Sequence, residues 1–195
     1  MSKTKQSEPI DGRRLRSERS RQAIIDATLA LMEEGVLVPT AQQISDRAGV
    51  GIRSFFRHFS DMESLFASIN DQIRESAESL FLGGDREGTL AERIQHAVER
   101  RADGYETESR MILSTAAQMW RYKVLRENYA HYQRGLRKDL DDWFPELAKL
   151  SPPQREAIDA ITSFEMWHRL RYHQKLGKKA AIKVIIENLT TLIPA

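Results

Sequence analysis

Apolar residues recur at helical spacing along almost all of this 195-residue chain, and no run alternates with the period of two that is typical of a strand. Residues three and four positions apart share one face of a helix, as Ile24, Ala27 and Leu31 do. The sequence therefore predicts an all-α fold. We expect nine helices, over residues 17–34, 41–48, 52–59, 61–82, 90–104, 106–119, 121–144, 152–176 and 179–192.

The starts of several helices carry the signature of a capping box. In this motif a Ser or Thr hydroxyl accepts from the N–H three residues on, and a Glu or Gln there accepts from the first residue's N–H. The candidate pairs are Thr40 with Gln43, Ser60 with Glu63, and Thr89 with Glu92. Glycine suits helix ends because it adopts left-handed backbone angles without a steric penalty. Glycines therefore set the predicted ends, including one at residue 104.

Composition excludes several classes of protein. The chain has no cysteine, which excludes disulfides, thiolate metal sites and cysteine nucleophiles. Its longest stretch without a formal charge, residues 35–45, is far shorter than the roughly 20 apolar residues of a membrane span. The first twelve residues lack the apolar segment of a signal peptide. We therefore expect a soluble, cytoplasmic protein without a membrane partner.

Basic residues gather near the amino terminus, although the whole chain is nearly balanced, with 30 basic and 28 acidic side chains. Glu18 is the only acidic residue within residues 13–21. The basic residues of this stretch are Arg13, Arg14, Arg16, Arg19 and Arg21. Such a cluster just ahead of the first helix is either a contact for an anionic polymer or a solvated terminus.

Residues 40–59 have the pattern of a helix-turn-helix. Two short helices flank Gly49-Val50-Gly51, and apolar residues four apart on each helix are placed to pack them together. In this motif the second helix enters the major groove of DNA. Its expected outward residues are small, polar or basic: Gly51, Arg53, Ser54, Arg57 and His58. The spacing alone also fits an ordinary helical hairpin.

The segment ATLALMEEG and the following TAQQISDRAGVGIRSFFRHFSDMESLF resemble the amino-terminal DNA-binding domain of TetR-type transcriptional regulators. The residues in register with the family pattern are Thr40, Ile44, Ala48, Gly49, Val50, Ser54, Phe55, His58, Phe59, Glu63 and Leu65. The resemblance implies a disordered polar arm (1–12), a helix-turn-helix domain (13–62) and a larger ligand-binding and dimerisation domain (63–195). It also implies a homodimer that binds a palindromic double-stranded DNA operator, acts as a repressor and is released by a small-molecule effector.

We expect the DNA-binding residues to include the early arginines and both helices of the motif: Arg13, Arg14, Arg16, Thr40, Gln42, Gln43, Gly51, Ile52, Arg53, Ser54, Phe56, Arg57 and His58. Three positions depart from the family pattern: Gly51 replaces Ser, Phe56 replaces Tyr and Met62 replaces Lys. Neither Phe56 nor Met62 offers the phosphate contact that Tyr and Lys commonly make in the family. Arg53 is the candidate base reader, because arginine pairs with two acceptors of guanine.

The larger domain has aromatic and methionine residues at helical spacing, which fits either a plain core or an effector pocket. The candidate pocket residues are Tyr105, Met119, Trp120, Tyr132, Met166 and Trp167. Gly135, in the middle of a helix, fits a close helix contact or a ligand-facing notch. By the resemblance, the last two helices form the dimer interface through Phe164, Leu170, Ala181, Val184, Ile185 and Leu189.

Two other classes of function remain open. One is a family member that has lost DNA binding and acts through protein partners, as the residues at 56 and 62 suggest. The other is an all-α enzyme, which a single ExxH motif, Glu165 to His168, favours. A carboxylate di-iron bundle needs two such motifs and two further Glu residues. We therefore predict no catalytic residue, no metal and no cofactor.

Overall fold

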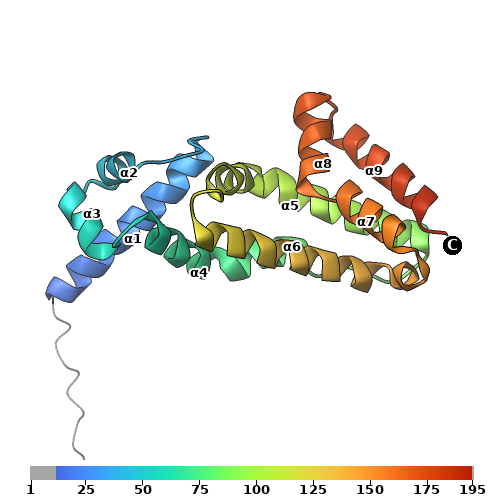
Figure 1. Cartoon of the computed structure of the whole chain (residues 1–195), viewed down its shortest axis with the longest axis horizontal. Coiled ribbons are helices and arrows are strands. Elements are labelled where there is room, and N and C mark those ends of the chain that lie inside the picture. The colour runs from blue at the N-terminus through green and yellow to red at the C-terminus, as the bar shows by residue number, and fades with distance from the viewer. Residues whose placement is uncertain (1–11, 195) are drawn as a thin grey trace, which may run out of the picture. The chain divides into compact units, whose positions relative to one another are not determined.

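The structure is a computed structural model that describes residues 12–194. This range is helical and contains no strand, which confirms the predicted all-α class (Figure 1). Its α-helices are α1 (Gly12–Glu33), α2 (Ala41–Ala48), α3 (Ile52–His58), α4 (Met62–Phe81), α5 (Leu90–Gln118), α6 (Lys123–Trp143), α7 (Pro152–Ile161), α8 (Phe164–His168) and α9 (Lys178–Leu192). A 3-10 turn, η1 (Pro145–Lys149), and a π-helical turn, η2 (Arg169–His173), complete the described elements. The polar arm expected over 1–12 lies outside the described residues, except for Gly12.

The chain forms two compact units. The first contains the described residues up to Asp71 together with Leu113–Leu125, and the second contains Gln72–Ile112 and residues from Arg126 onward. Three helices, α4, α5 and α6, therefore contribute residues to both units. No helix within residues 12–194 is long and apolar enough to cross a membrane.

In the first unit, α1, α2 and α3 pack around fully buried apolar side chains (Figure 1). These are Ile24 and Ile25 of α1, Ile44 of α2, Phe55 of α3 and Leu65 of α4. The predicted capping box at the start of α2 is confirmed: Gln43 N–H donates to the Thr40 hydroxyl, and Gln43 Oε1 accepts from Thr40 N–H. Gly49, with a left-handed φ of 66°, ends α2 as expected.

The predicted start of α4 was wrong in its capping residue. Asp61, not Ser60, accepts from the Ser64 backbone N–H, with Oδ1 2.8 Å from the nitrogen. Glu63 is directed elsewhere, and its Oε1 accepts from the backbone N–H of Val124 in the first turn of α6, at 2.8 Å. The local sequence is compatible with either Ser60 or Asp61 as the capping residue. The contact of Glu63 with the start of α6 joins residues far apart in the sequence, so only the structure shows it.

The predicted helix boundary at Gly104 was also wrong, because α5 runs without interruption from Leu90 to Gln118. Gly104 serves close packing instead: a Cβ atom placed on it would lie 2.6 Å from Cε1 of Phe81. Conversely, the single helix expected over 152–176 is divided. It ends at Ile161, and Ser163 caps α8 by accepting from Met166 N–H at 3.2 Å. The predicted total of nine helices thus arises from partly different segments.

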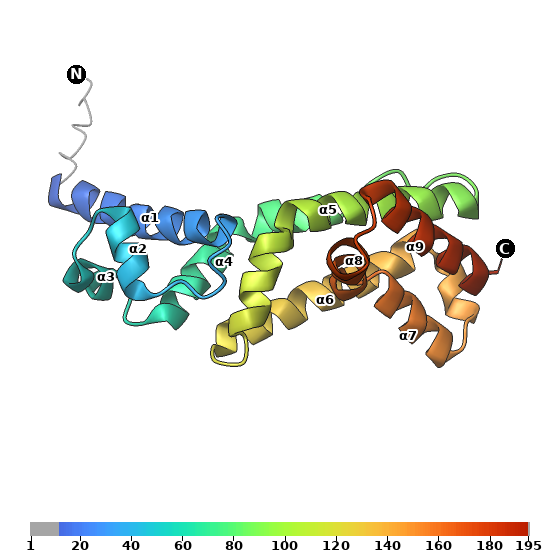
Figure 2. The same cartoon turned by 90° about the horizontal axis from the view of Figure 1, so that it is seen from above.

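In the second unit, α7, α8 and α9 gather beside α5 and α6 (Figure 2). The largest buried side chains come from several of these elements and include Ile94, Trp143, Phe144, Ile158 and Leu189. The π-helical turn η2 follows α8 directly, and Gln174 N–H donates to the Arg169 carbonyl five residues earlier. Such π turns are uncommon and are often found at functional sites.

Candidate nucleic-acid interface

The short helix α3 has one buried side and one exposed side. Phe55 and Phe59 are buried against the first unit, whereas Arg53, Phe56 and Arg57 are exposed. The exposed residues lie at i, i+3 and i+4, so they share one face of the helix. The Phe56 ring meets the buried Phe55 ring edge to face, with centroids 5.2 Å apart and planes at 76°. The outward face of α3 therefore presents one aromatic ring together with two arginine side chains.

This face is electropositive. It has two exposed arginines, Arg53 and Arg57, and no acidic residue occurs in α3. Arg57 Nη2 donates to Ser54 Oγ at 3.0 Å, which orients one guanidinium along the helix. Arg53 makes no hydrogen bond or ion pair with another residue of the range 12–194. Its five N–H donors are thus available to an anion or a base edge.

His58 stands at the carboxyl end of α3 and is half-buried. Partial burial lowers the pKa of its imidazole, and the nearby positive charges of Arg57 and Arg21 lower it further. Its Nε2 atom is buried and has no hydrogen-bond partner among the described residues. The phosphate contact expected of His58 stays a prediction.

The polar residues predicted on α2 lie at its first turn, where they already have local partners. The Thr40 hydroxyl also donates to Gln43 Oε1 at 2.9 Å, so both side chains of the capping box are engaged. Gln42 Nε2 donates to Asp46 Oδ1 at 2.8 Å. Thr40, Gln42 and Gln43 are nevertheless exposed, so their remaining donors and acceptors can meet a ligand.

The early arginines lie inside α1 and not ahead of it. This helix begins at Gly12, so Arg13, Arg14 and Arg16 occupy its first turns, and all three are exposed. The helical spacing fixes Arg13 and Arg16 on one face, because they are three residues apart. The cluster is therefore a basic surface on a helix, and its contact with DNA stays a prediction.

The candidate pocket residues are divided between the two units. Tyr105, Tyr132, Met166 and Trp167 belong to the second unit, and Met119 and Trp120 belong to the first. Trp120 is 77% exposed, and its Nε1 donates to the Ala117 carbonyl at 3.0 Å. The effector contact expected of these six residues stays a prediction.

A row of contacting aromatic rings in the second unit was not predicted from the sequence. It contains Phe81, Tyr105, Phe164, His168 and Tyr172, whose successive ring centroids are 5.3, 5.6, 5.6 and 4.4 Å apart. Complete burial raises the pKa of Tyr105 to about 12, and its hydroxyl donates to the Thr162 carbonyl at 3.0 Å. The spacing of four between residues 164, 168 and 172 was the available signal in the sequence.

A buried ionic cluster in the second unit was likewise not predicted. Asp139 of α6 is 1% exposed, and its Oδ1 accepts from Arg86 Nη2 at 2.6 Å. Arg101 of α5, 5% exposed, donates to the Thr162 hydroxyl at 3.0 Å and to the Leu136 carbonyl. Arg101 thereby connects α5 with α6 and with the junction of α7 and α8.

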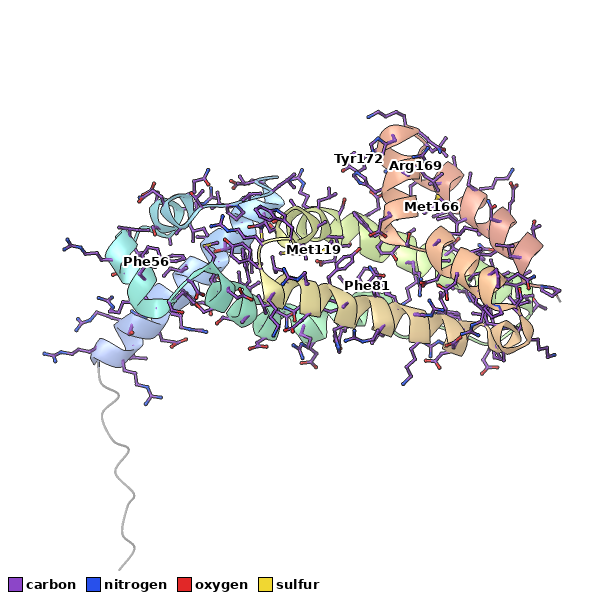
Figure 3. The ribbon with its side chains drawn as sticks, viewed as in Figure 1. Phe56, Phe81, Met119, Met166, Arg169 and Tyr172 are labelled. Atoms are coloured by element: carbon purple, nitrogen blue, oxygen red, sulfur yellow. The ribbon has the colours of Figure 1, made fainter. Side chains whose placement is uncertain are left out.

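The predicted dimer interface requires correction. Five of its six residues are buried within the single chain, because the apolar stripes of α8, η2 and α9 face their own core: Phe164, Leu170, Ala181, Ile185 and Leu189. Val184 alone of the set is partly exposed. On the outside of the same helices, Arg169 and Tyr172 are exposed and Met166 is half-buried (Figure 3). A contact between copies that uses α8 and α9 would have to employ this outer surface.

Both residues of the ExxH motif, Glu165 and His168, have partners within the chain. Tyr129 donates its hydroxyl proton to Glu165 Oε1 at 2.5 Å, and His168 is stacked between Phe164 and Tyr172. Within residues 12–194, no group of three His, Asp or Glu side chains is arranged to hold a metal ion.

Comparisons with known proteins agree with this architecture. Residues 24–69 match the family described as bacterial regulatory proteins, tetR family. A solved transcriptional regulator from Streptomyces coelicolor A3(2) is 22% identical, with a TM-score of 0.57 over 91% of this chain and 99% of that one. No curated protein sequence matches the chain significantly.

Two solved structures from Rhodococcus are also similar. A transcriptional regulator from Rhodococcus sp. Rha1 is 18% identical, with a TM-score of 0.63 over 90% of this chain and 96% of that one. A TetR-family transcriptional regulator from Rhodococcus sp. is 16% identical, with a TM-score of 0.60 over 90% of this chain and 99% of that one. The matches confirm the resemblance stated from the sequence at residues 24–69, and most of the chain shares the fold of these regulators.

Proposed function

We propose that this chain, a TetR-type transcriptional regulator, binds a palindromic DNA operator as a homodimer, represses transcription and is released by a small-molecule effector. The observation that carries DNA binding is the exposed face of α3, with Arg53, Phe56 and Arg57 outward and Phe55 buried behind them. A helix of this kind after a short turn is the element that enters a major groove.

The dimer follows from the geometry of such readers. One α3 helix reaches one half-site, and two copies related by a two-fold axis reach successive major grooves about 34 Å apart. The exposed surface of α8, η2 and α9, with Arg169, Tyr172 and Val184, supports self-association at this end of the chain.

The second unit is the proposed sensor. Tyr105, Tyr132, Met166 and Trp167 supply aromatic and thioether surface of the kind that lines small-molecule sites. An effector that prefers one conformation of the second unit would shift the population of the protein toward that conformation. Because α4, α5 and α6 contribute to both units, a change in their arrangement would alter the spacing of the two α3 helices.

The test is a DNA-binding measurement on the full chain. Binding to the region upstream of its own gene is followed by mobility shift at rising salt, with random DNA as competitor. We expect specific binding whose affinity falls steeply with salt, because phosphate contacts release counterions. Arg53→Ala should weaken binding by about 1–3 kcal/mol and relax base preference at one position of each half-site.

The matched control is Arg155→Ala. Arg155 lies on α7 and pairs with Asp141, Nη2 to Oδ1 2.5 Å, far along the chain from the helix-turn-helix. It should leave DNA affinity unchanged. Salt-insensitive binding, or no binding to genomic fragments of any sequence, would contradict the proposal and favour a regulator that acts through protein partners.

A further inference from the structure

Phe56 is unusual among the aromatic residues of the helix-turn-helix because its ring is half in solvent, 53% exposed. The neighbouring rings of Phe55 and Phe59 are buried. Its ring contacts Phe55 edge to face, and the helical spacing puts it on the same face of α3 as Arg53 and Arg57. An apolar ring beside two cations on an electropositive surface has no polar atom with which to bind a phosphate oxygen.

The major groove offers one prominent apolar group to such a ring. Guanine, adenine and cytosine present hydrogen-bonding atoms there, whereas thymine also presents its C5 methyl group. Contact between this methyl and an apolar side chain such as Phe is an established form of base readout. Arg53 and Arg57 would hold the helix against the acceptors and phosphates on either side of the ring.

We propose that Phe56 is a specificity-determining residue that reads the C5 methyl group of a thymine in each operator half-site. The inference rests on the proposed function, since it requires α3 to enter the major groove. It assigns one part of the base preference, beside that of Arg53, to the position where the family pattern has a tyrosine. A docking site for a protein partner is disfavoured here, because two exposed arginines, Arg53 and Arg57, share this face of α3 with the ring, and its other apolar residue, Ile52, is half-buried.

The experiment first selects binding sites from a random DNA pool with the full chain. Each thymine of the selected site is then replaced singly by uracil, which removes the methyl group and keeps the base-pairing edge. Uracil at one symmetric position should weaken binding about threefold to fivefold per half-site, the factor expected for one buried methyl-sized group. Uracil elsewhere should change affinity little.

Variants assign the effect to the ring. Phe56→Ala should bind the thymine and uracil operators equally, whereas Phe56→Leu, which keeps an apolar side chain, should retain part of the discrimination. Arg57→Ala is the matched control: it should weaken binding to both operators and preserve their ratio. Because Phe56 is exposed, both of its variants should fold, and thermal unfolding of each protein checks this.

The outcomes separate the inference from the proposed function. Specific operator binding without any uracil-sensitive position, or with sensitivity that persists in Phe56→Ala, overturns the role of Phe56 and leaves the regulator intact. Failure to select any DNA sequence overturns both.

Discussion

Gly104 of α5 lies directly against the ring of Phe81 of α4, so closely that a Cβ atom on the glycine would be 2.6 Å from Cε1 and 2.9 Å from Cδ1 of the ring. The contact lies within the second unit. Phe81 also packs on Tyr105, with ring centroids 5.3 Å apart, so the ring has a neighbour along α5 that limits its movement. The glycine is thus required by packing and not by backbone conformation.

Gly104→Ala should therefore destabilise the protein, although alanine is the better helix former by about 1 kcal/mol. We expect a loss of about 1–3 kcal/mol in the free energy of unfolding, because the new methyl group overpacks the contact with Phe81. Gly135→Ala is the control, since it also replaces a mid-helix glycine but has nothing within 4 Å of the added Cβ. It should stabilise by about 0.5–1 kcal/mol. Urea denaturation of both variants checks the opposite signs, and two stabilised variants would contradict the packing argument.

In the buried ionic cluster, we expect a single substitution to lower the free energy of unfolding much more than a double substitution does. Asp139 Oδ2 lies 3.7 Å from Arg101 Nη2, so Asp139→Ala leaves the Arg101 guanidinium buried without a countercharge and should lower the free energy of unfolding by about 3–5 kcal/mol. The pair Arg101→Met with Asp139→Leu removes the two most deeply buried charges, leaves only the partly exposed Arg86, and should recover much of this loss. The measurement is urea denaturation of each variant.

An exposed ion pair in the same unit serves as its control. Arg137 pairs with Glu156 on the surface, and Arg137→Ala should cost less than about 1 kcal/mol. If Asp139→Ala were no more costly than Arg137→Ala, the buried pair would have no structural role.

The pair of Arg93 with Glu146 predicts a pH dependence. Its hydrogen bonds from Arg93, with Nη2 2.5 Å and Nη1 3.1 Å from the carboxylate oxygens, hold the pKa of Glu146 below the usual value of 4.5. A lowered carboxylate pKa contributes stability above the unfolded-state value, and that stability is lost as pH falls through the folded-state value.

Wild type should therefore exceed Glu146→Gln in stability by about 1 kcal/mol near neutral pH, a figure reduced for the partial exposure of the pair. The difference should shrink below about pH 4.5 and vanish in stronger acid. Unfolding free energies of both proteins across this range provide the measurement. A constant difference would show that the pair contributes through shape and not through charge.

The sequence was sufficient to predict the role of a residue whose partners lie within a few positions of it. Thr40 with Gln43 and the left-handed Gly49 were predicted because a cap involves residues a few positions apart. Gly104 was misinterpreted because its role depends on a ring from another helix. The sequence pattern of a glycine after a helical segment is the same for a helix end and for a close contact.

The candidate sites also differ in whether local spacing or a contact between distant segments determines them. The exposed residues of α3 were predicted because the spacing of the buried Phe55 and Phe59 determines which residues face outward. Five of the predicted dimer residues lie in the core of the single chain, because an apolar stripe has the same period whether it faces its own core or a second copy. The contact of Arg101 with Asp139 joins two helices, and charge alone could not show which acidic and basic residues meet in the interior.

The basic surface on α1 predicts a sequence-independent contribution to DNA binding. Arg13→Ala, Arg14→Ala and Arg16→Ala should each weaken operator and random DNA alike, because phosphate contacts carry no base information. Each phosphate contact removed should reduce the slope of log affinity against log salt by about 1. Arg110→Ala on α5, also exposed, is the control and should leave the slope unchanged. Slopes equal to wild type for all three variants would exclude this surface from the DNA contact.

The outer surface of α8, η2 and α9 predicts the effect of charge on self-association. Tyr172 is 52% exposed on η2, and Val184 is partly exposed on α9. Tyr172→Glu and Val184→Glu should each weaken the proposed dimer by about 2 kcal/mol or more if these side chains lie near the centre of the contact, because a buried carboxylate there has no partner. Gln95→Glu adds the same charge at an exposed position on α5 and should leave association unchanged.

Sedimentation velocity over a range of protein concentrations separates monomer from dimer for each variant. Operator affinity should fall together with dimerisation, since a monomer presents one α3 helix to one half-site. Restoring the dimer by raising protein concentration should restore binding, which distinguishes this effect from damage to the helix-turn-helix. A wild-type chain that stays monomeric at micromolar concentration would contradict the dimer itself. If both glutamate variants associate as the wild type does, the dimer interface lies elsewhere on the chain.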